Sequence, residues 1–407
     1  MLVCRPLAAA LAVCLAPTAA QALPRFAARN AMECVQCHVN PTGGGARNEY
    51  GANVFARTFL PMTGGGRGDG GDSPATFSGA LNDTVRLGAD IRAAYLYIRP
   101  EQGRSPGVEP ESIGSFFLMQ ADLYHVVRVH PRVRLALDVG AYSGFEAWSL
   151  IDLSPDSRSF EAALKVGRFL PPFGIREVEH QLYTRGGVGL GASDRDTGLE
   201  LTTWIGPWTT HVALLNGALG DTPLDTTGGE RRSFEKAVSG RTSLAGVLGG
   251  LRLQVGVSGY FSNNNVRANP MFDRAIPVGL SAEVEQGVRE LRGGPFLSAS
   301  AGRLTYLADA VWVRDEFTSG RLGEITGLAT YQELSLVPTQ GVELIATHEF
   351  MDRDTQVKAD SVQRVGLVAE LFPFPLVELR VMGRKTFGDP VLRADAHDLV
   401  LFLHTFL

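Results

Sequence analysis

The feature that most constrains the fold of this chain is a period-two alternation of apolar and polar residues, which recurs from Thr84 to the C-terminus. In residues 85–97, for example, the apolar or aromatic face consists of Val85, Leu87, Ala89, Ile91, Ala93, Tyr95 and Tyr97. Similar alternation is found at 133–139, 342–350, 365–371 and 377–384. Successive side chains of a strand point to opposite faces. Segments of about 10 residues with one apolar face are typical of transmembrane β-barrels, although a soluble β-sandwich uses the same alternation.

The lengths of the connections favour the barrel. Tight links are predicted at His130-Pro131, Gly206-Pro207, Gly249-Gly250, Ala301-Gly302, Pro338-Thr339 and Phe372-Pro373. Between them lie long polar stretches at 99–114, 170–196, 217–233, 263–292, 317–324, 352–359 and 386–396. Short turns that alternate with long loops are the outer-membrane arrangement, in which the turns face the periplasm.

We expect about sixteen strands, an even number that leaves both ends on the periplasmic side. They are predicted at 84–98, 115–129, 132–142, 145–153, 159–169, 197–205, 208–216, 234–247, 251–262, 293–300, 303–316, 325–337, 340–351, 360–371, 375–385 and 397–407. The patterns at 145–153 and 293–300 are the weakest, so fourteen or eighteen strands remain alternatives. The inward charges, expected to be structural, are Arg86, Arg92, Arg132, Arg134, Asp138, Lys165, Arg364 and Arg380.

Charge and hydropathy exclude two other classes, nucleic-acid-binding proteins and helical membrane proteins. Over 407 residues the formal net charge is −5, which gives no basic footprint for nucleic acid. The sequence contains no apolar run of the ~18 residues that a membrane helix needs, so a membrane location requires a closed barrel. The barrel is predicted to occupy residues 84–407.

Residues 1–22 have the pattern of a secretory signal peptide. Arg5 precedes an apolar run, and Ala20-Gln21-Ala22 provides small residues for cleavage. A lipoprotein signal ending at Cys14 is an alternative. Either signal predicts export from the cytoplasm.

The next motif in the chain is Cys34-Val35-Gln36-Cys37-His38, the C-x-x-C-H attachment motif for c-type haem. Two thiols at this spacing can add to the two vinyl groups of one porphyrin, and the adjoining His38 is placed to bind the iron. A zinc site would need further Cys or His ligands, and residues 23–83 contain none besides the motif. A thioredoxin-like redox pair should lie near a βαβ pattern, which is also missing. We therefore expect haem c as the cofactor.

The haem-binding segment is predicted at 23–62, followed by a Gly-rich linker at 63–83. A segment of this size cannot bury a haem alone, so it should pack against the rest of the chain. Residues 40–45 should form a tight turn close to the porphyrin, and Arg47, Asn48 and Tyr50 either contact the haem propionates or lie on a surface helix. The distal iron ligand is Met62, a histidine from elsewhere, or none. His180 would approach the haem if the 170–196 loop folds inward.

Two resemblances add to this interpretation. The run from Lys165 to Gly174, with 196–201 and 215–217, resembles the central region of phosphate-selective-type outer-membrane porins. The order of a signal peptide, one C-x-x-C-H motif and a porin-like barrel is similar to the fused monohaem cytochrome–porins, of which the iron-oxidising outer-membrane cytochrome is the best-known type. That resemblance implies thioether attachment at Cys34 and Cys37 and axial ligation by His38.

The family resemblance also implies a function: electron transfer between an extracellular donor or acceptor and a periplasmic electron carrier. The extracellular chemistry would be that of a metal oxidase or reductase, for example toward Fe(II). We found no Ser/His/Asp or paired-carboxylate motif for acid–base catalysis. The alternatives are a diffusion porin whose haem segment is a periplasmic docking or assembly element, and a soluble periplasmic haem protein. The expected location is the outer membrane, in contact with its lipid, with the haem segment on the periplasmic side or in the lumen.

Overall fold

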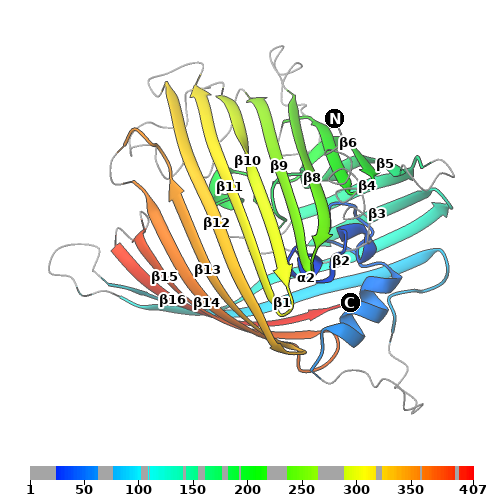
Figure 1. Cartoon of the computed structure of the whole chain (residues 1–407), viewed down its shortest axis with the longest axis horizontal. Coiled ribbons are helices and arrows are strands. Elements are labelled where there is room, and N and C mark those ends of the chain that lie inside the picture. Colours follow the sequence, from blue (N-terminus) through cyan, green and yellow to red (C-terminus); the bar gives the residue numbers. More distant parts are fainter. Residues whose placement is uncertain are drawn as a thin grey trace, which may run out of the picture.

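The structure is a computed structural model that describes residues 24–62, 77–101, 109, 111–140, 144–154, 161–176, 182–191, 194–217, 236–264, 288–317, 323–357, 360–389 and 394–407. Within these ranges, sixteen strands form one closed antiparallel barrel (Figure 1). Each strand pairs with its neighbours in the sequence, and the first pairs with the last to close the ring. The fold class predicted from the alternation is confirmed. The predicted signal peptide and most of the predicted linker lie outside the described residues.

The strand boundaries follow the predicted ones closely. The strands are β1 (Val85–Pro100), β2 (Ile113–His130), β3 (Val133–Gly140), β4 (Gly144–Asp152), β5 (Glu161–Phe169), β6 (Asp196–Ile205), β7 (Trp208–Leu215), β8 (Ala237–Leu248), β9 (Leu251–Asn264), β10 (Val288–Ala301), β11 (Leu304–Phe317), β12 (Glu324–Thr339), β13 (Val342–Asp352), β14 (Val362–Leu371), β15 (Val377–Asp389) and β16 (Ala394–Phe406). The weakly patterned segments at 145–153 and 293–300 are both strands.

The two faces of the barrel differ as the alternation requires. On β14, Leu367 is 71% exposed on the outside, whereas Glu370 is fully buried on the inside. Exposed apolar side chains recur around the outer surface at Leu123, Leu135, Leu253, Leu334 and Leu403. An outer face of this kind suits the hydrocarbon of a bilayer. No helix in the described ranges is long and apolar enough to cross a membrane.

One predicted lumen charge was wrong, and the largest error in a strand boundary is at the start of β10. Arg132 is exposed in the turn before β3, so it does not line the lumen. β10 begins at Val288, whereas the polar stretch was expected to continue to residue 292. Gly293-Gly294-Pro295 resembles a turn in the sequence, but β10 runs through it. The β10–β11 register continues on both sides of Gly294 and Pro295, and proline lacks the N–H that a ladder bond needs.

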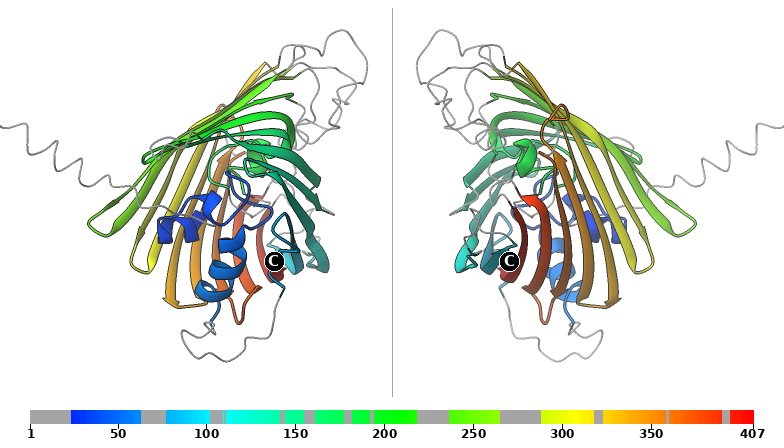
Figure 2. Two further views of the ribbon diagram at one scale, coloured as in Figure 1. Left: turned by 90° about the vertical axis from the view of Figure 1, so that its right-hand side faces the viewer. Right: turned by 90° about the vertical axis from the view of Figure 1, so that its left-hand side faces the viewer.

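The N-terminal segment lies inside the ring of strands, toward the end where the tight turns lie (Figures 1 and 2). It contains the α-helix α2 (Pro24–Asn30), the 3-10 helix η1 (Cys34–Gln36) and the π-helix η2 (Tyr50–Phe59). Arg25 of α2 fixes it to the wall. This buried guanidinium lies 2.6 Å from Glu370, 3.5 Å from Glu343 and 3.6 Å from Glu333, on three adjacent strands.

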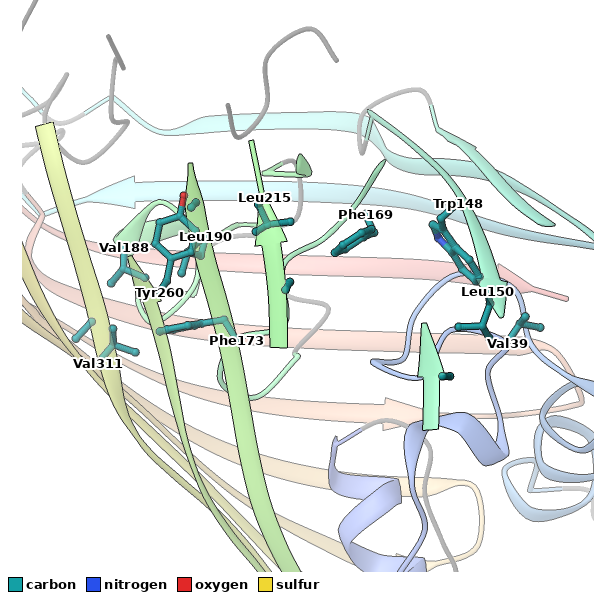
Figure 3. Packing of buried hydrophobic residues seen from close by; sticks show 14 of the residues in the cluster. Val39, Trp148, Leu150, Phe169, Phe173, Val188, Leu190, Leu215, Tyr260 and Val311 are labelled. Carbon is teal, nitrogen blue, oxygen red and sulfur yellow. The ribbon is translucent and has the colours of Figure 1, made fainter. Parts of the chain in front are cut away.

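The described parts of the connection between β5 and β6, residues 170–176, 182–191 and 194–195, also fold into the lumen, an alternative that the sequence left open. Its 3-10 helix η3 (Gly186–Val188) presents the Val188 carbonyl to Arg292 on β10, at 2.9 Å. The Tyr183 amide donates to Glu349 on β13, at 3.1 Å. Phe173, Val188 and other apolar residues of this connection pack in one cluster with residues of the surrounding strands (Figure 3). The inward loop therefore narrows the lumen.

Candidate functional site

The C-x-x-C-H motif is shaped by local hydrogen bonds. The amides of Cys37 and His38 both donate to the Cys34 carbonyl, at 3.1 and 2.9 Å, which forms η1. The chain then turns at Asn40, whose carbonyl accepts from the Gly43 amide at 2.9 Å. Gly43 has a φ of +83°, a conformation that glycine adopts without steric cost. The predicted tight turn after the motif is present.

The two thiols and the imidazole of the motif share one cavity inside the barrel. Cys34, Cys37 and His38 all line it. The space not filled by protein atoms is about 2020 Å³, which includes parts open to solvent. Aromatic side chains form much of the apolar wall: Phe55, Phe296, Phe372, Phe402 and Phe406. An apolar cavity with a few convergent polar groups is the usual form of a cofactor site.

Two glycines allow close packing around the thiols. A Cβ at Gly51 would overlap the carbonyl oxygen of Cys37, so η2 can approach the motif only with glycine at this position. A Cβ at Gly43 would lie 3.2 Å from the Cys34 sulfur. The backbone therefore approaches both cysteines of the motif closely.

Burial favours the neutral forms of the Cys34, Cys37 and His38 side chains. Burial raises the pKa of Cys37 to about 12, and burial also raises the pKa of Cys34. Burial, with the nearby charges of Arg47 and Arg176, lowers the pKa of His38 to about 3. A neutral imidazole keeps the lone pair that an iron ligand needs. The buried His38 Nδ1 has no hydrogen-bond partner within the described residues.

This donor set fits a covalently attached haem. Two cysteines at C-x-x-C spacing face one cavity, and the next residue supplies a neutral imidazole. The cavity wall is apolar enough to shield a porphyrin and carries cations that could pair with its propionates. Four arginines of the cavity wall could do this: Arg47, Arg92, Arg176 and Arg241.

Arg47, Asn48 and Tyr50, predicted either to contact haem propionates or to lie on a surface helix, have different environments. Arg47 lines the cavity and donates to Asp90 at 3.0 Å, and its guanidinium lies 4.6 Å from the Phe406 ring centroid. The Asn48 side chain donates to the Val35 carbonyl at 2.9 Å, so it stabilises the motif's own loop. The Tyr50 hydroxyl lies 4.0 Å from the Met32 sulfur. Arg47 is the one of the three that lines this cavity.

Met62 is placed at the turn end of the barrel. Its amide donates to the Phe372 carbonyl at 2.7 Å, its side chain is 47% exposed, and it packs against Gly341. Within the described residues it does not line the cavity that contains the motif. Its ligation to iron stays a prediction without support from this arrangement. His180 lies outside the described residues.

The structure also brings to the cavity residues that sequence reasoning did not single out. Among them are Asp90 on β1, Arg176 after β5 and His404 on β16. Arg176 donates to the Thr42 hydroxyl at 3.3 Å, and a Cβ at Gly44 would lie 2.6 Å from its guanidinium. The alternation predicts that His404 faces inward. It does not predict which inward residues meet the motif, because that depends on the tilt and stagger of all the strands.

Comparisons with known proteins concern the barrel. No protein-family model matches the chain, and neither does any curated protein sequence. Solved structures do match. An anion-selective porin from Comamonas acidovorans is 11% identical with a TM-score of 0.54, covering 80% of this chain and 99% of that one.

Two further porin-like structures match over similar lengths. Pseudomonas putida OprB is 10% identical with a TM-score of 0.54, and the match covers 87% of this chain and all of that one. Outer-membrane expressed OmpT of Vibrio cholerae is 10% identical with a TM-score of 0.51, covering 79% and 97%. At this level of identity the likeness concerns the fold. The barrel of this protein has the fold of outer-membrane porins.

Proposed function

We propose that this protein carries electrons across the bacterial outer membrane through one c-type haem held inside its barrel. One observation carries the proposal: Cys34, Cys37 and His38 line a cavity enclosed by a closed barrel with an apolar outer face. The resemblance to fused monohaem cytochrome–porins points to the same function. The likeness to porin structures supports the barrel alone. It supports neither the haem nor the electron transfer.

In this proposal Cys34 and Cys37 hold the haem through thioether bonds and His38 binds the iron. Bound there, the haem supplies a one-electron Fe(III)/Fe(II) couple. The chain contributes an apolar wall, from Phe55, Phe372 and Phe406, that shields the group from water and so influences its potential.

The buried ion pairs hold the haem segment in one position relative to the wall. Arg25 contacts three glutamates of β12, β13 and β14, and Arg29 also pairs with Glu343. On the opposite side, Lys165 of β5 donates to the Asn40 side chain at 3.0 Å. A fixed position matters because the rate of electron transfer depends on the distance between donor and acceptor.

Each end of the barrel would meet a different redox partner. The haem segment lies toward the end with the tight turns, which faces the periplasm in outer-membrane barrels. A periplasmic electron carrier would dock at this end. An extracellular donor or acceptor would reach the cavity from the loop end, past the inward connection between β5 and β6. That connection favours small, soluble reactants such as metal ions over a protein.

A second candidate is a diffusion porin, in which the N-terminal segment has no role in electron transfer. The likeness to an anion-selective porin and to other porin structures favours it. This candidate requires an open path past the N-terminal segment and the inward loop. It makes no use of the thiols and imidazole that face the cavity.

Two experiments separate the candidates. A haem stain of the denatured protein, produced in a host that matures c-type cytochromes, should be positive in the outer-membrane fraction. The stain should be lost when both cysteines are replaced, Cys34→Ser together with Cys37→Ser, because one remaining cysteine can still form one thioether; a stain that survives the double change contradicts attachment at this motif. In intact cells, a membrane-impermeant reductant should reduce the haem. A haem that is present but untouched from outside would favour the diffusion porin.

A further inference from the structure

Two arginines that line the cavity of the motif have no carboxylate partner among the described residues. They are Arg185, in the inward connection between β5 and β6, and Arg241, on β8. Arg185 is 4% exposed and donates to the Phe173 carbonyl at 2.5 Å. The Nε of Arg241 is buried without a hydrogen-bond partner, and its guanidinium lies 4.6 Å from the Phe296 ring centroid. Removing a charge from water is costly unless an opposite charge pairs with it.

The cavity as a whole has an excess of positive charge. Eight arginines line it, against five carboxylates. Three of these carboxylates already have basic partners, at 2.6, 3.0 and 2.8 Å: Glu370 with Arg25, Asp90 with Arg47 and Glu378 with His404. The excess remains even if all five carboxylates are ionised.

Arg176 adds a third guanidinium beside the motif. It donates to the Thr42 hydroxyl at 3.3 Å, in the turn that follows the motif. Its contact with a carboxylate is long, 3.6 Å to Glu146, and Glu146 is closer to Arg195, at 3.1 Å. Arg176 therefore retains N–H donors for another anion.

The three guanidinium groups lie close enough to affect one another. Burial, together with the charges of Arg176 and Arg241, lowers the pKa of Arg185 to about 10, so Arg185 is still charged at neutral pH. Burial raises the pKa of Cys34, and the charges of Arg241 and Arg176 oppose that rise, which brings both arginines close to the motif. A cleft lined by one sign of charge concentrates counter-ions, and the planar fork of a guanidinium matches carboxylate and phosphate groups.

A reactant from the loop end passes the inward connection, which carries two of the three arginines (Figure 2). We propose that Arg176, Arg185 and Arg241 form an anion site, and that the extracellular redox reactant is an anionic metal chelate and not a bare metal cation. This rests on the proposed function. One electron moves between the chelated metal and the haem iron, whose oxidation states change by one in opposite directions, and no bond or proton is transferred. The haem propionates have the same carboxylate chemistry, so the test separates the two sources.

The first test compares two oxidants of opposite charge. Full-length protein with covalent haem is purified from outer membranes, reduced, and mixed in a stopped-flow instrument with the anion ferricyanide or the cation tris(phenanthroline)cobalt(III). Arg185→Gln combined with Arg241→Gln should slow oxidation by ferricyanide about tenfold or more, and should not slow oxidation by the cobalt complex. Each oxidant is compared only with itself across variants. A changed haem potential would alter both rates in the same direction.

The matched control removes two arginines near the loop end that do not line the cavity. Arg289→Gln combined with Arg314→Gln changes the net charge equally, and the two side chains are 58% and 49% exposed. Both rates should stay at their wild-type values. Arg185→Lys combined with Arg241→Lys keeps the charges and should keep most of the ferricyanide rate. In the wild type, added salt should slow ferricyanide and not the cobalt complex, and an equal response to salt would overturn the proposal without any variant.

The second test needs no haem and identifies the source of the anion. The Cys34→Ser/Cys37→Ser protein, in planar bilayers across a KCl gradient, should have a reversal potential that favours chloride over potassium. Adding Arg185→Gln and Arg241→Gln should reduce this preference. The haem-loaded protein should keep it if the site takes a free reactant. Loss of the preference on haem loading would mean that the propionates occupy the arginines, which overturns the anionic reactant.

The outcomes distinguish this inference from the proposed function. Covalent haem with a ferricyanide rate that is unchanged by loss of both arginines overturns the anionic reactant and leaves the proposed function standing. A barrel recovered without covalent haem overturns the proposed function, and with it the redox reactant. The reversal potential then still decides whether the arginines form an anion site.

Discussion

Arg25 and Glu370 are 345 residues apart in the chain, yet the Arg25 Nη2 and Glu370 Oε1 atoms lie 2.6 Å apart with both side chains buried. The pair joins the first described helix to the wall of the barrel. Glu370 is also 3.1 Å from Arg380 on the next strand, so the anchor belongs to a larger network. Because the surroundings exclude water, losing one partner leaves an uncompensated buried charge.

Replacing Arg25 with alanine should therefore release the N-terminal segment. A broken buried ion pair costs about 3–5 kcal/mol, and here three glutamates lose the same partner. We expect faster trypsin cleavage within residues 24–62 of the folded protein, measured by mass spectrometry over time. Arg289→Ala is the control, because its pair with Glu316 is exposed and such pairs contribute about 0–1 kcal/mol. Equal cleavage rates in both variants would show that Arg25 is no anchor.

Gly51→Ala should reduce the yield of covalent haem. A methyl group at this position overlaps the Cys37 carbonyl oxygen, so η2 and the motif must separate. The measurement is the haem stain relative to total barrel protein in the outer-membrane fraction. Gly246→Ala is the control, since a Cβ there meets no atom within 4 Å. A stain ratio for Gly51→Ala equal to that of Gly246→Ala would contradict the close packing at the motif.

A charge on the outer face should destabilise the barrel according to its depth. Leu367 lies within β14 and is 71% exposed, so Leu367→Arg should cost about 2–4 kcal/mol if this position is near the bilayer midplane. Leu251 is the first residue of β9, directly after a tight turn, and Leu251→Arg should cost about 0–1 kcal/mol. The free energy of unfolding in lipid vesicles measures both. Equal costs would argue against a bilayer around the middle of the barrel.

Removing residues 23–62 should increase the ion conductance of the barrel. Residues 24–62 and the described parts of the connection between β5 and β6 lie inside the ring of strands (Figure 2). Single-channel currents in planar bilayers should be small for the intact protein and larger for the deletion variant. Conductances that do not differ would mean that ions already pass freely beside the N-terminal segment.

The sequence predicts the barrel well because its strands carry the pattern in their own residues. Alternation identifies even β4 and β10, where the pattern is weak. The early start of β10 was missed because residues 288–292 are mostly charged and continue a long polar stretch, and only their pairing with β9 makes them a strand. Arg132 was misassigned because a boundary error of one residue moves a side chain from the strand into the turn.

The sequence predicts only the part of the candidate site whose residues are adjacent in the chain. Cys34, Cys37 and His38 are adjacent in sequence, so their chemistry is visible as a motif. His404 is an isolated histidine in an ordinary strand pattern. Its proximity to the motif arises from barrel closure and from the docking of the N-terminal segment, which no local pattern specifies.

The pairing of β1 with β16 has a consequence for how the protein matures. Once these strands join, the barrel wall encircles residues 24–62, which restricts the access of a large assembly enzyme to Cys34 and Cys37. Under the proposed function, the porphyrin must be attached in the periplasm before the barrel closes, while the N-terminal segment is still accessible. The chain would then insert into the outer membrane with the haem already attached.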